Sequence, residues 1–174
     1  NLIKTTNEYC GVQYNHPGPA HLGIGQEAAY VGAAYELTLD DYTFGSHRSH
    51  GEIIAKGLRT IQILDDAKLL EIMQNFFGGR TYSVIKDSGK TVKEVAINFL
   101  LYGMMCETFA RKNGFNQGLG GSMHAFFTPF GIYPNNAIVG GSGSIAPGAA
   151  LFKLSNKKPG VVVCNIGDGS MACG

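Results

Sequence analysis

The chain has 174 residues, of which 44% are hydrophobic and 16% are charged, and its formal net charge is +1. This length is enough for one domain with a hydrophobic core, and the composition is that of an ordered globular protein. A charge this close to neutral, with no dense basic run, argues against a nucleic-acid-binding protein. Because the sequence has no stretch of 18 uninterrupted apolar residues, we expect no membrane span.

The four cysteines form neither a CxxC pair nor a zinc-like pattern. Three of them lie in apolar or glycine-rich segments, which are typical of free, buried thiols. With no recognisable signal peptide at the start, this predicts a reducing compartment. We expect the cytoplasm, or the mitochondrial matrix if the protein is eukaryotic.

The first third of the chain is expected to contain helices around one short strand. Small residues at positions 25–37 predict a helix suited to close packing. A strand is expected at 42–44 and a polar loop at 46–51. A helix from 52 to 56 should follow, ended by Gly57 as its C-cap.

Two further helices are predicted by their start signals. Asp65 and Asp66 precede apolar residues at helical spacing, so a helix should begin there and end at the glycine pair 78–79. Thr91 and Glu94 match a capping box, which predicts a helix running from there to about residue 112.

Glycines cluster beyond residue 114 and predict a long loop region from 114 to 148. Loops of this length in a compact domain are usually functional. The segment 140–144 superficially resembles a phosphate-cradling loop, but it lacks the lysine and spacing of a P-loop and equally suits a flexible linker. A helix is expected at 148–154 and a turn at 156–160. The alternation of helices with a buried strand predicts an α/β layered domain.

The strongest functional signal is the turn that follows the last strand. Residues 161–166 are mostly apolar and predict a buried parallel strand, and Gly167, Asp168 and Gly169 come directly after it. Such a turn lets a backbone approach a phosphate, and a carboxylate is a hard ligand suited to Mg²⁺. The alternative is a hairpin turn between two strands. The small, non-alternating residues 170–174 favour the start of a helix instead.

Histidines in polar loops are the second group of candidates. His21, His47 and His50 lie in glycine-flanked segments, and the last two bracket Arg48. Imidazole can transfer protons or donate hydrogen bonds near neutral pH, and an arginine can bind a phosphate or carboxylate. The alternative is that residues 46–51 form a solvated loop with no role in a site. For His124 the alternative is likewise structural: a loop histidine that is hydrogen-bonded to a nearby carbonyl. The spacing of these histidines fits no compact metal site.

Six motifs occur in an order that is similar to a known family. They are GIGQEA at 23–28, DDYTFGSHRSHG at 40–51, KGL at 56–58, GLGGSMH at 118–124, AIVGG at 137–141 and GDG at 167–169. This series resembles the N-terminal half of the alpha subunit of the thiamine diphosphate-dependent decarboxylating component of 2-oxo acid dehydrogenase complexes. Members act on pyruvate, branched-chain 2-oxo acids or acetoin. The resemblance implies a thiamine diphosphate-binding fold, a parallel sheet flanked by helices, of which residues 1–174 are the N-terminal, incomplete part.

The resemblance implies which residues hold the diphosphate end of the cofactor. Asp168 would bind Mg²⁺. Gly167, Gly169 and Ser170 would lie at the diphosphate, with backbone contacts from the last two. Arg48 would contact the same region.

The resemblance also implies residues for the reacting end of the cofactor. Ala137 and Val139 would line the aminopyrimidine pocket, where Val139 would help to hold the cofactor bent. His21 would lie near the reacting carbon. His47, at a position where the family often has tyrosine, is the second candidate catalytic residue.

The implied reaction is the decarboxylation of a 2-oxo acid, with the protein supplying geometry and electrostatics for the cofactor. The acyl group would pass to a lipoyl-bearing acyltransferase. A beta subunit would contribute a glutamate and complete an α2β2 heterotetramer. Two alternatives are a transketolase-like enzyme that acts on sugars and a non-catalytic, truncated subunit with a role in binding or assembly.

Three departures from the family pattern are expected to matter. Residues 80–107 make a longer link than usual before GFNQGLGGSMH and are interpreted as an insertion. Ala172 stands where the family usually has asparagine. The second Mg²⁺-ligand region and a later histidine-bearing loop are absent from the sequence, so this chain alone is expected to bind the cofactor poorly.

Overall fold

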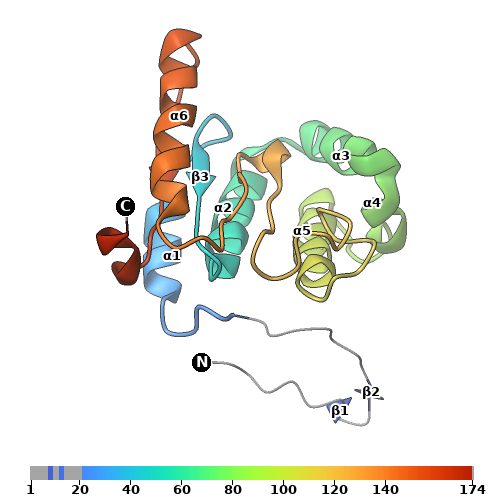
Figure 1. Cartoon of the computed structure of the whole chain (residues 1–174). Coiled ribbons are helices and arrows are strands. Elements are labelled where there is room, and N and C mark those ends of the chain that lie inside the picture. Colours follow the sequence, from blue (N-terminus) through green and yellow to red (C-terminus); the bar gives the residue numbers. More distant parts are fainter. Residues whose placement is uncertain (1–7, 10–11, 14–20, 174) are drawn as a thin grey trace.

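The computed structural model describes residues 8–9, 12–13 and 21–173, and it combines helices with two small sheets (Figure 1). The strands β1 (Glu8–Tyr9) and β2 (Val12–Gln13) pair antiparallel, whereas β3 (Tyr42–Phe44) and β4 (Val162–Cys164) pair in parallel. The helices are α1 (Glu27–Ala34), α2 (His50–Ile63), α3 (Asp66–Asn75), α4 (Arg80–Ile85), α5 (Val92–Thr108) and α6 (Gly141–Ser155). Short 3-10 turns cover Phe76–Gly79, Thr128–Phe130 and Asp168–Ala172. The predicted α/β character is confirmed, as is the strand at 42–44.

The hydrophobic core lies between α2, α3, α5 and the loop that follows α5. Fully buried apolar side chains from these elements meet there, with aromatic rings at its centre. Phe115 and Phe127 stack with their ring centroids 4.4 Å apart, and Phe99 lies 5.5 Å from Phe115. Helix α1 and helix α6 lie on the other side of the molecule, beside the parallel strands (Figure 1). The core therefore anchors α2, which packs against α1 on its other side, while α6 packs against β4.

The two predicted helix starts are confirmed by their caps. Thr91 Oγ1 accepts a 3.2 Å hydrogen bond from Glu94 N, and Glu94 Oε2 accepts one of 3.1 Å from Thr91 N. Asp65 Oδ1 accepts a 2.7 Å hydrogen bond from Lys68 N at the start of α3. These contacts satisfy N–H groups that the first turn of a helix leaves without partners.

Several predicted helix boundaries are wrong: α2 begins at His50 rather than at residue 52, α5 ends at Thr108 rather than near residue 112, and the two largest differences involve glycines. Gly57 does not end a helix but lies inside α2, where it faces Leu100 of α5. A Cβ at this position would lie 2.5 Å from Leu100 Cδ2, so the glycine permits the close approach of two helices. Helix α6 begins at Gly141 rather than at residue 148 and includes Pro147, so part of the expected loop is helical.

Asp41 fixes the start of β4 to the start of β3. Its Oδ1 accepts a 2.7 Å hydrogen bond from Val161 N, and its Oδ2 accepts one of 2.6 Å from Thr38 N. Lys153 of α6 donates to the carbonyls of Asp40 and Pro159 from the same side. Because the two strands start together and pair in parallel, the loops that follow them meet at one edge of the sheet.

The last strand is parallel as predicted, but it is half-buried rather than buried. In the described part of the chain its hydrogen-bonded neighbour is β3 alone, which leaves its other edge without a paired strand. The cysteines also differ from expectation. Cys106 and Cys164 are half-buried free thiols and Cys173 is an exposed one, while Cys10 lies outside the described residues.

Residues 80–107, interpreted as an insertion, form α4 and most of α5 and contribute Phe99 and Leu100 to the core. That interpretation stays a prediction. Among the described residues, no helix combines the length and the apolar character needed to cross a membrane.

Candidate functional site

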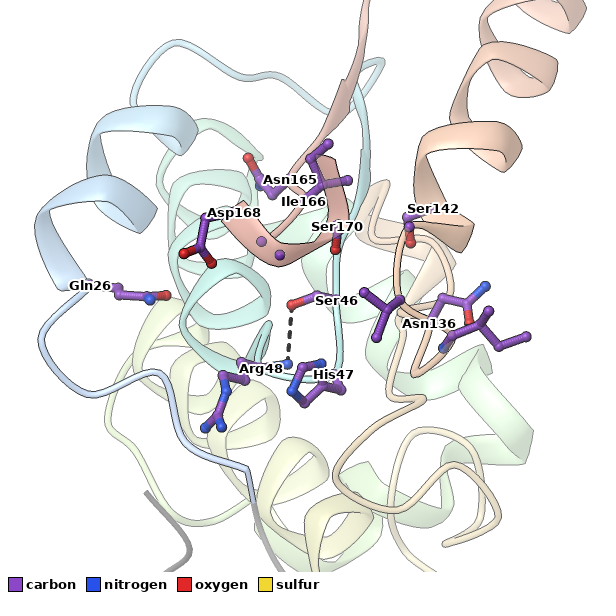
Figure 2. A pocket seen from close by; sticks show the side chains of 15 residues that line it. Gln26, Ser46, His47, Arg48, Asn136, Ser142, Asn165, Ile166, Asp168 and Ser170 are labelled. Atoms are coloured by element: carbon purple, nitrogen blue, oxygen red, sulfur yellow. Dashed lines mark hydrogen bonds between the residues drawn. The ribbon is translucent and has the colours of Figure 1, made fainter. Parts of the chain in front are cut away.

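A cavity of about 260 Å³ opens where β3 and β4 end (Figure 2). Four segments of the chain meet around it: the start of α1, the loop after β3, the loop before α6 and the turn after β4. The lining residues are Gln26, Ser46, His47, Arg48, Asn136, Ile138, Val139, Gly140, Ser142, Asn165, Ile166, Gly167, Asp168, Gly169 and Ser170. Ligands of open α/β sheets bind at this position, outside the carboxyl ends of parallel strands.

The turn after β4 is a 3-10 helix that begins at Asp168. Ser170 N donates a 2.9 Å hydrogen bond to the Gly167 carbonyl, which closes the turn. A Cβ at Gly169 would have no heavy atom within 4 Å, so the backbone there faces open space. Across the turn, Gly140 has a φ of 81°, and a Cβ at this residue would lie 3.1 Å from Cys173. Glycines thus let two backbone segments come together and leave the wall of the cavity free for a ligand.

The loop after β3 places His47 in the cavity and turns Arg48 partly away from it. Arg48 Nη1 donates a 2.8 Å hydrogen bond to the Leu22 carbonyl, and Arg48 N donates one of 3.3 Å to Ser46 Oγ. Figure 2 shows the guanidinium group pointing away from Asp168. Contact between Arg48 and an anion at the Asp168 turn therefore requires the side chain to leave Leu22.

The surroundings of His47 favour the neutral form of its imidazole. Burial lowers its pKa below the usual range, and the positive charge of Arg48 and the nearby His21 act in the same direction. The rings of His21 and His47 are arranged edge to face, with centroids 5.1 Å apart. A neutral imidazole in a cavity can accept a proton, which is one requirement for a general base.

The cavity includes most of the predicted site residues but not all of them. His47, Arg48, Val139 and residues 167–170 line it, whereas His21 and Ala137 do not. The His21 ring packs edge to face against the His47 ring, and the neighbours of Ala137, namely Asn136 and Ile138, line the cavity in its place. His124 lies in a separate apolar cavity of about 430 Å³ beside the aromatic core.

Several lining residues were not predicted, and some of them lay next to signals in the sequence. Gln26 is part of the GIGQEA motif, and Ser46 begins the SHRSHG loop. Asn165 and Ile166 end the predicted strand directly before Gly167. Position after a strand would have identified these two, because the first residues beyond a parallel strand lie at the ligand edge. Ser142 lies in the glycine-rich segment 140–144, which the sequence did not distinguish from a flexible linker, and it belongs to a helix that begins earlier than expected.

The side chains that line the cavity can be compared with those that a metal-bound diphosphate requires. Asp168 is the one acidic residue among the lining residues, and Ser46, Ser170 and two asparagines add neutral oxygens. No three His, Cys, Asp or Glu side chains in the described part of the chain lie close enough to hold a metal ion. Mg²⁺ is commonly bound through one or two carboxylates, with phosphate and water completing its coordination. One carboxylate beside an open glycine backbone fits that pattern.

Comparison with known proteins identifies the family. The sequence profile of the dehydrogenase E1 component matches residues 10–82 and 86–174. The chain belongs to the dehydrogenase E1 component family. The resemblance drawn from the six motifs is thereby confirmed, and membership of this family implies thiamine diphosphate as the cofactor.

The dehydrogenase E1 relatives include alpha subunits of two kinds. The chain is 31% identical, over 88% of its length, to the alpha subunit of acetoin:2,6-dichlorophenolindophenol oxidoreductase from Bacillus subtilis, and covers 34% of that protein. It is 26% identical over 97% of its length to the pyruvate dehydrogenase E1 component subunit alpha of Rhizobium meliloti, covering 38% of it. It is 28% identical over 97% of its length to the corresponding subunit of Zymomonas mobilis, covering 37% of it. The chain thus spans between 34% and 38% of these relatives' lengths.

Proposed function

We propose that this chain is part of the alpha subunit of a thiamine diphosphate-dependent dehydrogenase that decarboxylates a 2-oxo acid. The observation that carries the proposal is the meeting of four motif-bearing segments at the ends of β3 and β4. The relatives' names add support, because they are alpha subunits of pyruvate dehydrogenase and of an acetoin oxidoreductase. Pyruvate or a compound of similar size is the proposed substrate.

The turn after β4 is the proposed site of the Mg²⁺-diphosphate. Asp168 would provide the carboxylate ligand, and the backbone of Gly167, Gly169 and Ser170 would face the phosphate oxygens. The open space beside Gly169 supports this assignment, since a side chain there would fill the room that a phosphate needs. Arg48 would join them by exchanging the Leu22 carbonyl for an anionic oxygen.

The loop before α6 is the proposed seat of the aminopyrimidine end. Ile138 and Val139 expose 72% and 55% of their surface, and both line the cavity. Their apolar side chains would pack against a ring and exclude water from it. Ala137 would act through its position between Asn136 and Ile138 rather than by contact, which refines its assignment.

His47 is the proposed proton acceptor at the reacting end, with the His21 ring packed against it. When bound, thiamine diphosphate would supply the thiazolium ring that accepts the electron pair released on decarboxylation. The lowered pKa of His47 keeps its imidazole available as a base near neutral pH. His21, 5.1 Å away between ring centroids, would orient the His47 ring or the substrate.

The complete enzyme would include partners that this chain does not contain. We propose a beta subunit in an α2β2 heterotetramer and a lipoyl-bearing acyltransferase as the acceptor of the acyl group. The designation of the relatives as alpha subunits supports a second type of subunit. Apolar surface at the rim of the cavity that the cofactor leaves exposed would be covered by such a partner.

The test is ligand-dependent thermal stability. The chain, alone and with its beta subunit, is titrated with thiamine diphosphate in the presence and absence of Mg²⁺, and the melting temperature is followed. We expect a Mg²⁺-dependent rise in the partnered sample that Asp168→Ala removes and that Asp87→Ala, at an exposed position outside the cavity, retains. An equal response of Asp168→Ala and the unmodified protein would overturn the proposal, as would no Mg²⁺-dependent rise at all.

A further inference from the structure

Glu52 has a carboxyl group that the proposed mechanism does not use, although it lies beside the cavity. It occupies the third position of α2, three residues after Ser49. This pair matches the capping-box pattern, yet the Ser49 side chain makes no cap hydrogen bond at the start of α2. The same pattern at Thr91 and Glu94 forms the full box. Glu52 is therefore not placed to cap its own helix.

Instead, the side chains of Ser49 and Glu52 converge on the backbone of Gly45, the residue after β3. A Cβ at Gly45 would lie 2.0 Å from Ser49 Oγ and 2.3 Å from Glu52 Oε2. The Gly45 carbonyl accepts a 2.7 Å hydrogen bond from Ser142 Oγ and one of 3.1 Å from Asn136 N. Gly45 thus joins two walls of the cavity, and the Glu52 carboxyl packs directly against this junction.

The second partner of Glu52 is Asn165, the residue after β4. The Asn165 side chain interacts with the Glu52 carboxyl and favours its charged form. Asn165 N donates a 2.9 Å hydrogen bond to the Phe44 carbonyl, so the residue is tied to both strands. Asn165 also lines the cofactor cavity and stands just before the turn that begins at Gly167. The Asn165 side chain therefore connects the Glu52 carboxyl to the segment that leads into the turn.

The space around Glu52 is too small for a ligand. It is a cavity of about 10 Å³ between α1, α2, β3 and β4, about the volume that one water molecule needs. The role of the carboxyl must therefore lie in contacts with the protein. We propose that Glu52 is a positioning residue that holds the end of β3 and Asn165 together, and through them the turn of residues 167–170. This inference rests on the proposed function of that turn.

The surroundings also predict that this contact changes near neutral pH. Burial raises the pKa of Glu52 to about 7, against the opposing effects of Ser49 and Asn165. The titratable groups that face it are Tyr30 from α1, Lys56 from α2 and Cys164 from β4. Lys56 donates to the Thr38 carbonyl, so its ammonium group is engaged elsewhere. A protonated carboxyl can donate a hydrogen bond to Asn165, whereas an ionised one can only accept. Protonation of Glu52 therefore changes the hydrogen bond that positions Asn165 and the turn after it.

The first experiment needs no cofactor. Hydrogen exchange is measured on the amides of residues 165–170 in the unmodified chain and in Glu52→Ala, Glu52→Gln and Glu94→Ala. We expect at least threefold faster exchange in Glu52→Ala, and intermediate or unchanged exchange in Glu52→Gln, which keeps the shape and the hydrogen bond. Glu94→Ala removes a cap glutamate at the same helix position and should leave these amides unchanged. Unchanged exchange in Glu52→Ala would overturn the inference, whatever the cofactor does.

The second experiment separates this inference from the proposed function. The dissociation constant for Mg²⁺-thiamine diphosphate is measured from pH 6 to 8 in the partnered protein and in its Glu52→Gln form. We expect the unmodified protein to show a change of about threefold or more across this range that Glu52→Gln lacks. Equal pH profiles would overturn the role of Glu52 in cofactor binding. If neither protein binds the cofactor, the proposed function fails, and the exchange rates alone decide the role of Glu52.

Discussion

Glu107 Oε1 accepts a 2.7 Å hydrogen bond from the backbone N–H of Gly120, which joins the end of α5 to the glycine-rich loop. The same carboxylate accepts three further backbone N–H groups, from Asn116, Gly118 and Gly121, at 2.7 to 3.1 Å. Glu107 is fully buried, with 0% of its surface exposed. One carboxylate therefore sets the path of the loop, which explains how a segment so rich in glycine adopts a single conformation.

Replacement of Glu107 should unfold this loop. Glu107→Ala leaves four donors without their acceptor, and we expect the free energy of unfolding to fall by about 3–5 kcal/mol. Glu107→Gln should also destabilise, because its amide group would face two N–H donors. Urea denaturation measures both. A loss below about 1 kcal/mol in Glu107→Ala would contradict the assigned role.

Substitution by alanine should destabilise the protein at Gly57 and stabilise it at Gly32. In Gly57→Ala the new methyl group would lie 2.5 Å from Leu100 Cδ2, and overpacking of this kind costs about 1–3 kcal/mol. In Gly32→Ala, on α1, the methyl group has no neighbour within 4 Å, and the better helix propensity should stabilise by about 0.5–1 kcal/mol. Thermal denaturation of both variants checks this, and combination with Leu100→Ala should relieve the clash at Gly57. The same sign at both sites would refute the packing argument.

Asp41→Asn should weaken the attachment of β4 to β3. The pKa of Asp41 lies below its usual range: burial acts to raise it, but the hydrogen bonds from Val161 and Thr38 together outweigh that effect. A carboxyl with a lowered folded-state pKa contributes stability at neutral pH that is lost as the pH falls through that pKa. We expect Asp41→Asn to cost about 2 kcal/mol at pH 7, the order of a hydrogen bond to a charged group. The difference should shrink in acid, and a difference that does not change between pH 7 and pH 3 would contradict the mechanism.

Local signals in the sequence predicted those features that depend on local chemistry. The cap residues Asp65 and Thr91 were correct because an N-cap acts on N–H groups within three residues. The turn at Asp168 was found for the same reason, since a glycine–carboxylate turn after a strand is a local pattern. The role of Gly57 was not predicted, because it depends on contact with Leu100, which is distant in the sequence. The sequence alone does not distinguish a glycine at a close helix–helix contact from a glycine that ends a helix.

The candidate site shows the same division between local and tertiary information. The resemblance pointed to the loop before α6, where Asn136, Ile138 and the predicted Val139 line the cavity and Ala137 does not. Which residues of a loop face a cavity depends on how the loop folds against its neighbours, so a motif can locate the loop without identifying each lining residue. Glu52 was missed altogether, because its contacts with Gly45 and Asn165 exist only once β3 and β4 have paired.

Glu52→Gln should make the protein more stable near neutral pH. Below about pH 4.5 the carboxyl is protonated in both the folded and the unfolded chain, so its ionisation does not change the free energy of unfolding. Between pH 4.5 and about 7 only the unfolded chain ionises, and the free energy of unfolding falls with rising pH. Above pH 7 the loss is complete, and at 1.36 kcal/mol per pH unit it amounts to about 3 kcal/mol.

Because glutamine does not titrate, the stability of Glu52→Gln relative to the unmodified chain should be lowest near pH 4.5 and reach its maximum above pH 7. Urea denaturation at pH 4.5, 5.5, 7 and 8 measures it, with Glu36→Gln, at an exposed position, as the matched control. A difference between Glu52→Gln and the unmodified chain that stays constant with pH would mean that Glu52 ionises equally in the folded and unfolded states. A stabilised variant that holds the cofactor less well would show that the buried carboxyl is kept for function at the expense of stability.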